Sequence, residues 1–123
     1  MTQRILVVED NDELSTLLRL MLKLSDWEIR SAVDGYEALE RAREFRPTLV
    51  LLDIMLPGID GIEVCRRLRA EPYMAGVPIV ILSAKGDEPT RQAAQAAGAV
   101  EYWVKPVSPA EFLKDIRRVL AAY

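Results

Sequence analysis

The sequence predicts an α/β domain in which a parallel sheet lies between two layers of helices. Three short runs are apolar without alternation: ILVV at 5–8, LVLLDI at 49–54 and VPIVIL at 77–82. Continuous runs of leucine and β-branched residues are typical of strands that are covered on both faces. Helical patterns separate these runs, which indicates a doubly wound fold with right-handed crossovers. The length of 123 residues fits a single domain, 1–123.

Two further segments are predicted to complete a sheet of five strands. EIRSA at 28–32 and EYWV at 101–104 are more polar than the other three runs, so we place them nearer the edges of the sheet. Neighbouring side chains on a strand point to opposite faces. Tyr102 and Trp103 are therefore expected on opposite sides of their strand, with Trp103 interpreted mainly as a core residue.

Start signals and apolar stripes predict the helices. Either Asn11 or Asp12 is expected to cap a first helix whose apolar residues follow helical spacing, at Leu14, Leu17, Leu18, Met21 and Leu22. DGYE at 34–37 and SPAE at 108–111 have the spacing of capping boxes, and Pro109 suits the first position of a helix. The last helix carries a second stripe, at Phe112, Leu113, Ile116, Val119 and Leu120.

Composition excludes several classes of function. The formal net charge of −3 provides no basic field that would hold nucleic acid or an anionic membrane. The chain has no histidine, which excludes imidazole metal sites and His-based catalytic triads. Its one cysteine, Cys65, cannot form an intramolecular disulfide and is expected to be a buried small hydrophobe. There is no signal peptide pattern and no apolar run near the ~18 residues that span a bilayer, so we expect a cytoplasmic protein.

Charged and polar residues follow the predicted strands and are expected to gather at one edge of the sheet. Ligands of open parallel sheets bind outside the carboxyl ends of the strands. The residues at these ends are Glu9 and Asp10, Asp53, Ser83 and Ala84, and Lys105 and Pro106.

This group of acids indicates a cation site and phosphoryl chemistry. Two carboxylates ~4 Å apart repel by about 4 kcal/mol at an effective dielectric near 20. A Mg²⁺ ion relieves such repulsion, whereas zinc is disfavoured without histidine or a second cysteine. Asp53 could attack a phosphoryl donor, with Lys105 and Ser83 contacting the transferred group. The alternative interpretation is that an acid after a strand only caps the next helix, which we favour for Asp12 and Asp34.

Four stretches in this order resemble the receiver (CheY-like) domain of response regulators in two-component signalling. They are VVEDN at 7–11, LLDIMLPGIDG at 51–61, ILSAKG at 81–86 and GAVEYWVKPVSPAEF at 98–112. The resemblance implies a three-layer α/β/α, flavodoxin-like fold, with five helices and a five-stranded parallel sheet in the order 2-1-3-4-5. It also implies a signalling switch rather than an enzyme, with Mg²⁺-dependent self-phosphorylation from a donor and slow autodephosphorylation.

The resemblance assigns roles by position. Asp53 matches the phosphoacceptor, and Glu9 and Asp10 match the acidic pair that holds Mg²⁺. Met55 matches the position whose backbone carbonyl completes the metal site.

Further positions match the residues that respond to phosphorylation. Ser83 matches the hydroxyl that turns toward the phosphoryl group, and Lys105 matches the lysine that pairs with it. Ala84 matches the small neighbour that leaves room for the group, and Pro106 matches a cis-proline. Tyr102 matches the switch aromatic, which is expected to move inward when Ser83 is recruited.

The sequence departs from the family pattern at several of these positions. Glu9 replaces the commoner aspartate with a longer side chain. Ser83 replaces threonine and loses the methyl group that restricts the rotamer. Met55 and Lys85 occupy positions that tune how fast the phosphoryl group is lost in similar proteins.

The resemblance also implies partners. Because this chain has no histidine, a histidine kinase or a histidine phosphotransfer protein is expected to supply the phosphoryl group, and an effector protein or domain to receive the signal. No direct contact with nucleic acid or membrane is expected. A homodimer is a further hypothesis, through the face of the fourth helix, fifth strand and fifth helix, where charged residues fall at Arg91, Glu101, Glu111 and Arg117.

Two rival functions remain open from the sequence. One is a phosphatase or phosphotransferase similar to haloacid dehalogenases, which typically place a second aspartate where this chain has Met55. The other is a binding module whose acidic site has lost its phosphoacceptor role.

Overall fold

The five predicted strands form one parallel sheet in the order β2-β1-β3-β4-β5, which confirms the predicted topology. The computed structural model describes residues 2–123. The elements in chain order are β1 (Arg4–Val8), α1 (Asp12–Leu22), β2 (Glu28–Ala32), α2 (Gly35–Phe45), β3 (Leu49–Leu52), α3 (Gly61–Arg69), the 3₁₀ turn η1 (Pro72–Met74), β4 (Ile79–Ser83), α4 (Glu88–Ala96), β5 (Glu101–Val104) and α5 (Pro109–Ala122).

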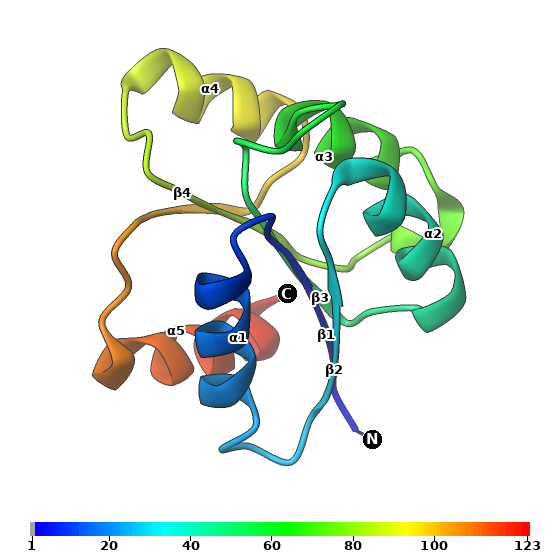
Figure 1. The fold of residues 1–123 in the computed structure, drawn as a ribbon. Helices are drawn as coiled ribbons and strands as arrows, with labels where there is room; N and C mark the ends of the chain where they lie inside the picture. Colours follow the sequence, from blue (N-terminus) through cyan, green and yellow to red (C-terminus); the bar gives the residue numbers. More distant parts are fainter. Residues whose placement is uncertain (1) are drawn as a thin grey trace.

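Helices cover both faces of the sheet, α1 and α5 on one side and α2, α3 and α4 on the other (Figure 1). Alternate residues of β1 point to the two sides, so that Ile5 and Val7 join the core under α1 and α5, whereas Leu6 and Val8 join the core under α2 and α3. This double burial explains why the strands are continuously apolar. Among residues 2–123, no helix is long and apolar enough to cross a membrane.

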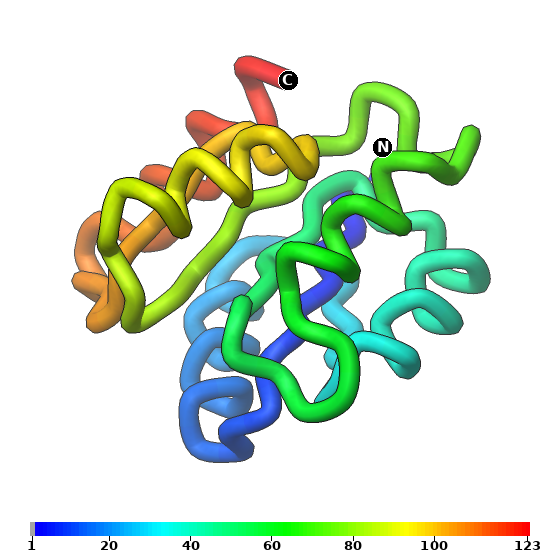
Figure 2. Tube along the Cα trace, turned by 90° about the horizontal axis from the view of Figure 1, so that it is seen from above, coloured from blue at the N-terminus to red at the C-terminus, as the bar shows by residue number. Residues whose placement is uncertain are grey.

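The loops that follow the strands meet along one edge of the molecule, which is the lower edge in Figure 2. All three strands predicted from apolar runs start or stop at different residues from those runs, and β1 begins one residue earlier, at Arg4. β3 ends at Leu52 because the chain turns after Asp53, where the carbonyl of Ile54 accepts the N–H of Gly61 at 2.9 Å. β4 begins at Ile79 rather than at 77, directly after Pro78, which has no N–H to donate.

Helix caps follow the sequence signals in part. Asn11 caps α1, with its side-chain oxygen 2.9 Å from the N–H of Leu14. Asp34 caps α2, but Glu37 accepts the N–H of Val33 rather than that of Asp34, so only half of the predicted capping box forms.

The capping box predicted at 108–111 is wrong. The Ser108 side chain makes no capping hydrogen bond, although α5 does begin at Pro109. The backbone explains the difference. Pro109 has no N–H that needs a partner, and the carbonyl of Ser108 accepts the N–H groups of Glu111 and Phe112 at 3.1 and 2.9 Å.

Tyr102 and Trp103 lie on opposite faces of β5, as predicted. Trp103 packs on the side of α5, where its ring meets that of Phe112 edge to face at 6.4 Å. Its indole N–H donates to Glu101 at 2.9 Å, and Glu101 also accepts two hydrogen bonds from Arg118 of α5 at 2.7 and 2.8 Å. Glu101 therefore ties the edge strand to α5.

Cys65 is fully buried in α3, with its sulfur 3.5 Å from the carbonyl oxygen of Ala97. Burial raises the pKa of this thiol to about 11. The residue is a core side chain and not a reactive thiolate, in agreement with the interpretation from sequence.

The hydrogen bonds that Glu101 accepts predict a contribution to the free energy of unfolding that is lost in acid. The hydrogen bonds from Arg118 lower the pKa of Glu101 below its ordinary value of 4.5. Because the folded-state pKa is depressed, the stabilisation is complete above pH 4.5 and is lost as the pH falls below it. We expect Glu101→Gln to lower the urea midpoint at pH 7, and we expect this deficit to shrink as the pH falls below 4.5. A deficit that does not change with pH would contradict this account.

Candidate functional site

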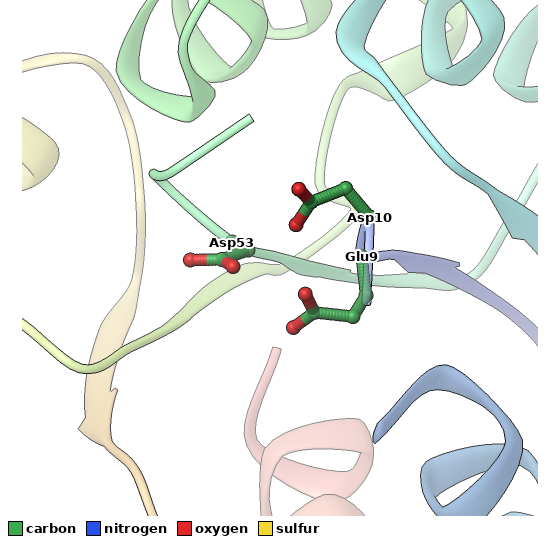
Figure 3. Close-up of side chains that lie close together, drawn as sticks. All are labelled: Glu9, Asp10 and Asp53. Carbon is green, nitrogen blue, oxygen red and sulfur yellow. The ribbon is translucent and has the colours of Figure 1, made fainter. Parts of the chain in front are cut away.

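Glu9, Asp10 and Asp53 converge at the carboxyl edge of the sheet, each with one carboxylate oxygen within 4.8 Å of the others. Figure 3 shows the three side chains around a common space. The register of the sheet brings them together, since Val8 at the end of β1 lies opposite Leu52 at the end of β3. The residues that follow these two strands must therefore be neighbours.

The three acids differ in their environment. Glu9 and Asp53 are buried, at 3% and 4% exposure, whereas Asp10 is exposed. Burial raises the pKa of Glu9, and this effect exceeds the lowering by hydrogen bonds from Lys105 and from the N–H of Asn11. The raised pKa of Glu9 indicates that the folded protein disfavours the ionised form of this carboxyl group.

Lys105 partly offsets the unfavourable burial of these negative charges. Its ammonium group donates to Glu9 Oε1 at 2.7 Å and to Asp53 Oδ2 at 3.0 Å. Burial on its own lowers the pKa of Lys105, but the hydrogen bonds to Glu9 and Asp53 and the negative charges of these carboxylates together outweigh burial and leave the pKa raised. The lysine is therefore charged at neutral pH and bridges strands β1, β3 and β5.

Backbone N–H groups orient the two buried carboxylates. Met55 N–H donates to Asp53 Oδ1 at 3.2 Å, and Asn11 N–H donates to Glu9 Oε2 at 3.1 Å. Both oxygens of Asp53 thus have donors, one from a side chain and one from the backbone. The side chain of Met55 is 57% exposed at the rim of the site.

The site is suited to a hard divalent cation. Three carboxylates share one small space, and among residues 2–123 the ammonium of Lys105 is the cation that contacts them, at Glu9 and Asp53. Carboxylate oxygens with room for water are what Mg²⁺ prefers, and neither histidine nor a second cysteine is available to favour zinc.

Gly61 is a positioning residue that the sequence analysis did not identify. A Cβ atom at this position would lie 2.0 Å from the carbonyl oxygen of Asp53. The close approach lets the N-terminus of α3 pack directly against the end of β3. The Asp-Gly pair at 60–61 was the available signal, because Asp60 caps α3 and the residue after it must leave space for the strand end.

Ser83 lies at the end of β4 and is fully buried. Its hydroxyl accepts the N–H of Lys85 at 3.3 Å, so it is engaged within its own loop. The carbonyl of Ser83 accepts the N–H of Lys105 at 2.9 Å, which links this loop to the lysine. Ala84, which follows Ser83, is exposed.

The loop after β5 carries the remaining predicted residues. The peptide bond between Lys105 and Pro106 is cis. Tyr102 is half-buried, and its hydroxyl donates to the carbonyl of Lys85. The guanidinium of Arg91 lies over the Tyr102 ring at 4.9 Å, a contact that the sequence analysis did not anticipate.

A parallel sheet in the order 2-1-3-4-5 with acids at the carboxyl ends of β1 and β3 is the arrangement expected of a receiver domain from the sequence resemblance. The family of response regulator receiver domains matches residues 5–117, and the chain belongs to this family. The match confirms the resemblance seen in the sequence.

Curated relatives are transcriptional regulators of about twice this length. The phosphate regulon transcriptional regulatory protein PhoB of Rhizobium meliloti (strain 1021) is 43% identical over 120 residues, which are 98% of this chain and 53% of that protein. The DNA-binding response regulator MtrA of Mycolicibacterium smegmatis is 45% identical over 117 residues, which are 95% of this chain and 50% of MtrA. The chain thus spans about half the length of these relatives.

Solved structures are similar along almost the whole chain. A putative response regulator from Chloroflexus aurantiacus J-10-fl has a TM-score of 0.91 and 36% identity, covering 98% of this chain and 99% of that one. The receiver domain of the sensor histidine kinase PA1611 from Pseudomonas aeruginosa PAO1, solved with a magnesium ion coordinated in its active site cleft, has a TM-score of 0.90 and 31% identity over 99% of this chain and 100% of that one.

The contact at Gly61 predicts a large loss of stability on a minimal substitution. In Gly61→Ala the new methyl group meets backbone atoms that cannot yield, so we expect a loss of about 3 kcal/mol or more in urea unfolding. Gly76→Ala is the matched control. Gly76 has φ of +76° but nothing within 4 Å, so alanine there should cost about 1 kcal/mol from backbone strain alone. Equal losses in the two variants would refute a steric role for Gly61.

Proposed function

We propose that Asp53 accepts a phosphoryl group and that the domain uses this modification as a signalling switch. The observation that carries the proposal is the environment of this one carboxylate, which is buried at a strand end and bound on Oδ2 by Lys105 and on Oδ1 by the N–H of Met55. A fixed carboxylate beside a charged lysine is oriented for nucleophilic attack and has a cation at hand for the oxygens of the transferred group.

The donor is a phosphohistidine of a kinase or phosphotransfer protein, because this chain has no histidine of its own. A carboxylate oxygen of Asp53 attacks phosphorus, the bond from phosphorus to the imidazole nitrogen breaks, and the imidazole leaves with the electron pair and takes up a proton. Water later cleaves the acyl phosphate, which regenerates the Asp53 carboxylate and releases inorganic phosphate.

Glu9, Asp10 and Asp53, with the backbone of Met55, would hold a Mg²⁺ ion. When bound, the ion supplies the positive charge that offsets the clustered carboxylates and the incoming phosphoryl oxygens. Lys105 supplies a second, fixed positive charge, and its ammonium can shift from Asp53 to a phosphoryl oxygen with little movement. The magnesium ion in the PA1611 receiver domain supports this part of the proposal.

Ser83 and Tyr102 are the residues that change position after phosphorylation. Once phosphorus is on Asp53, a charged phosphoryl oxygen can accept a hydrogen bond from the Ser83 hydroxyl, which in its own loop only accepts the N–H of Lys85, and we expect the hydroxyl to turn toward that group. Tyr102 then loses its contact with the rearranged loop and moves inward. Phosphorylation acts by favouring one of two arrangements that the domain already samples.

The signal is passed to a protein partner or an effector domain, since PhoB and MtrA are transcriptional and DNA-binding regulators about twice as long as this chain.

Pairing of two copies through α4, β5 and α5 is a second candidate output. The structure corrects one residue of that hypothesis: Arg117 donates to Ser25 at 2.8 Å on the α1 side, and Arg118 is the α5 arginine that reaches Glu101. Arg91 and Glu111 remain candidates for that face.

Phosphorylation is tested by intact mass after incubation with acetyl phosphate, with and without Mg²⁺. We expect wild type to gain one phosphoryl group only when Mg²⁺ is present, and Asp53→Asn to gain none. Asp60→Asn is the matched control, because Asp60 is the exposed cap of α3 in the same loop and asparagine also caps. It should be modified like wild type.

Two results would count against the proposal. Modification of Asp53→Asn would place the acceptor elsewhere. If wild type gained no mass and also failed to bind beryllofluoride in the presence of Mg²⁺, the domain would be a binding module without a phosphoacceptor.

A further inference from the structure

The loop from Ser83 to Asp87 is held in place from two directions. On its inner side, the Ser83 hydroxyl accepts the N–H of Lys85. On its outer side, the Tyr102 hydroxyl donates to the carbonyl of the same residue, Lys85. The group expected to turn toward the phosphoryl oxygen is thus connected to the switch aromatic through a single residue of the loop.

Arg91 of α4 contacts both the tyrosine and the loop. Its guanidinium lies 4.9 Å from the centre of the Tyr102 ring, and its Nε donates to the carbonyl of Gly86 at 3.2 Å. One side chain therefore holds both the tyrosine and the residue that follows Lys85. Arg91 and Tyr102 are both half-buried, so part of the attraction between the cation and the ring is shielded from water.

The rest of α4 provides little competing anchorage. Its sequence, EPTRQAAQA, is rich in alanine, and Ala94 is its buried residue. The hydrogen bond from Gln92 to Glu88 lies within the helix itself. Arg91 is therefore a side chain of α4 that connects this helix both to the loop and to β5.

We propose that Arg91 is a positioning residue that holds Tyr102 against the loop of residues 83–87 and so keeps the Ser83 hydroxyl bonded to the N–H of Lys85. The inference rests on the proposed function of Asp53 and adds its regulation. When the Ser83 hydroxyl turns to the phosphoryl group it releases the N–H of Lys85, and the loop is then free to move. Movement of Lys85 and Gly86 breaks the contacts with Tyr102 and Arg91 together, so Arg91 favours the unphosphorylated arrangement.

Removal of Arg91 should therefore make activation easier. A ligand that binds one of two states has an apparent affinity set by the fraction of molecules in that state. A cation–π contact of this kind, together with one hydrogen bond, corresponds to roughly a two- to tenfold change in that fraction. We expect Arg91→Ala to bind beryllofluoride, a phosphoryl mimic, two- to tenfold more tightly than wild type in the presence of Mg²⁺.

Isothermal titration calorimetry with beryllofluoride and Mg²⁺ measures this change. Arg91→Gln is a second variant, since its amide can still reach the carbonyl of Gly86 but cannot provide the cation, and it should also bind more tightly. Arg41→Ala is the matched control, because Arg41 is an exposed arginine on α2 that only approaches Glu37 at 3.9 Å. It should bind like wild type.

The backbone amide resonance of Ser83 provides a readout away from the substituted side chain, because Arg91 contacts Tyr102 and Gly86 rather than Ser83. Without beryllofluoride, the Ser83 amide signal of Arg91→Ala should lie between those of free and beryllofluoride-bound wild type. In a Tyr102→Ala background, the additional loss of Arg91 should raise beryllofluoride affinity by less than it does in wild type, because only the hydrogen bond to Gly86 remains to be lost.

The outcomes separate the two proposals. If wild type does not bind beryllofluoride, the function proposed for Asp53 fails. If wild type binds and Arg91→Ala binds equally or more weakly, the holding role of Arg91 is wrong, and weaker binding that depends on protein concentration would assign Arg91 to a contact between copies instead. An equal gain from Arg91→Ala with and without Tyr102 would also overturn the proposal.

Discussion

The ammonium of Lys105 between the buried carboxylates of Glu9 and Asp53 is the interaction on which the rest of the site depends. Without it, two acids that the sheet register forces together would face each other in a region that water hardly reaches. The lysine comes from the loop after β5, at the far end of the sheet order from β2. One side chain thus connects three strands, and any change of charge at Asp53 is felt directly in the loop after β5.

The same arrangement leaves the site short of positive charge. Glu9 has a raised pKa despite its bond to Lys105, and Asp10 adds a third carboxylate within 4.8 Å. Such a cluster is a poor way to stabilise a fold but a good way to bind a divalent cation and a phosphoryl group. The fold tolerates the cluster because the parallel sheet, continuously apolar and covered on both faces, supplies the stability that the edge lacks.

Much of this architecture was predictable because it depends on short-range patterns. Apolar runs gave the strands, and the rule that carboxyl ends share an edge placed Glu9, Asp10, Asp53 and Lys105 together. Residues whose roles depend on tertiary contact were missed or misplaced. Arg117 and Arg118 are adjacent in sequence, yet a helix turns 100° per residue, so that one reaches Ser25 and the other Glu101. Gly61 and Arg91 have no local signal that shows what a methyl group or a guanidinium would meet.

The weak anchorage of α4 is explained if the domain has to exist in two arrangements of similar free energy. A helix fixed by large apolar side chains could not shift without opening a cavity in the core, which would cost several kcal/mol. An alanine-rich helix loses little apolar contact when it shifts, and its position can then be set by polar contacts such as those of Arg91 with Tyr102 and Gly86. In this view, the composition of α4 is as much a part of the switch as Asp53, because a phosphoryl group can only select between states that the rest of the chain keeps close in energy.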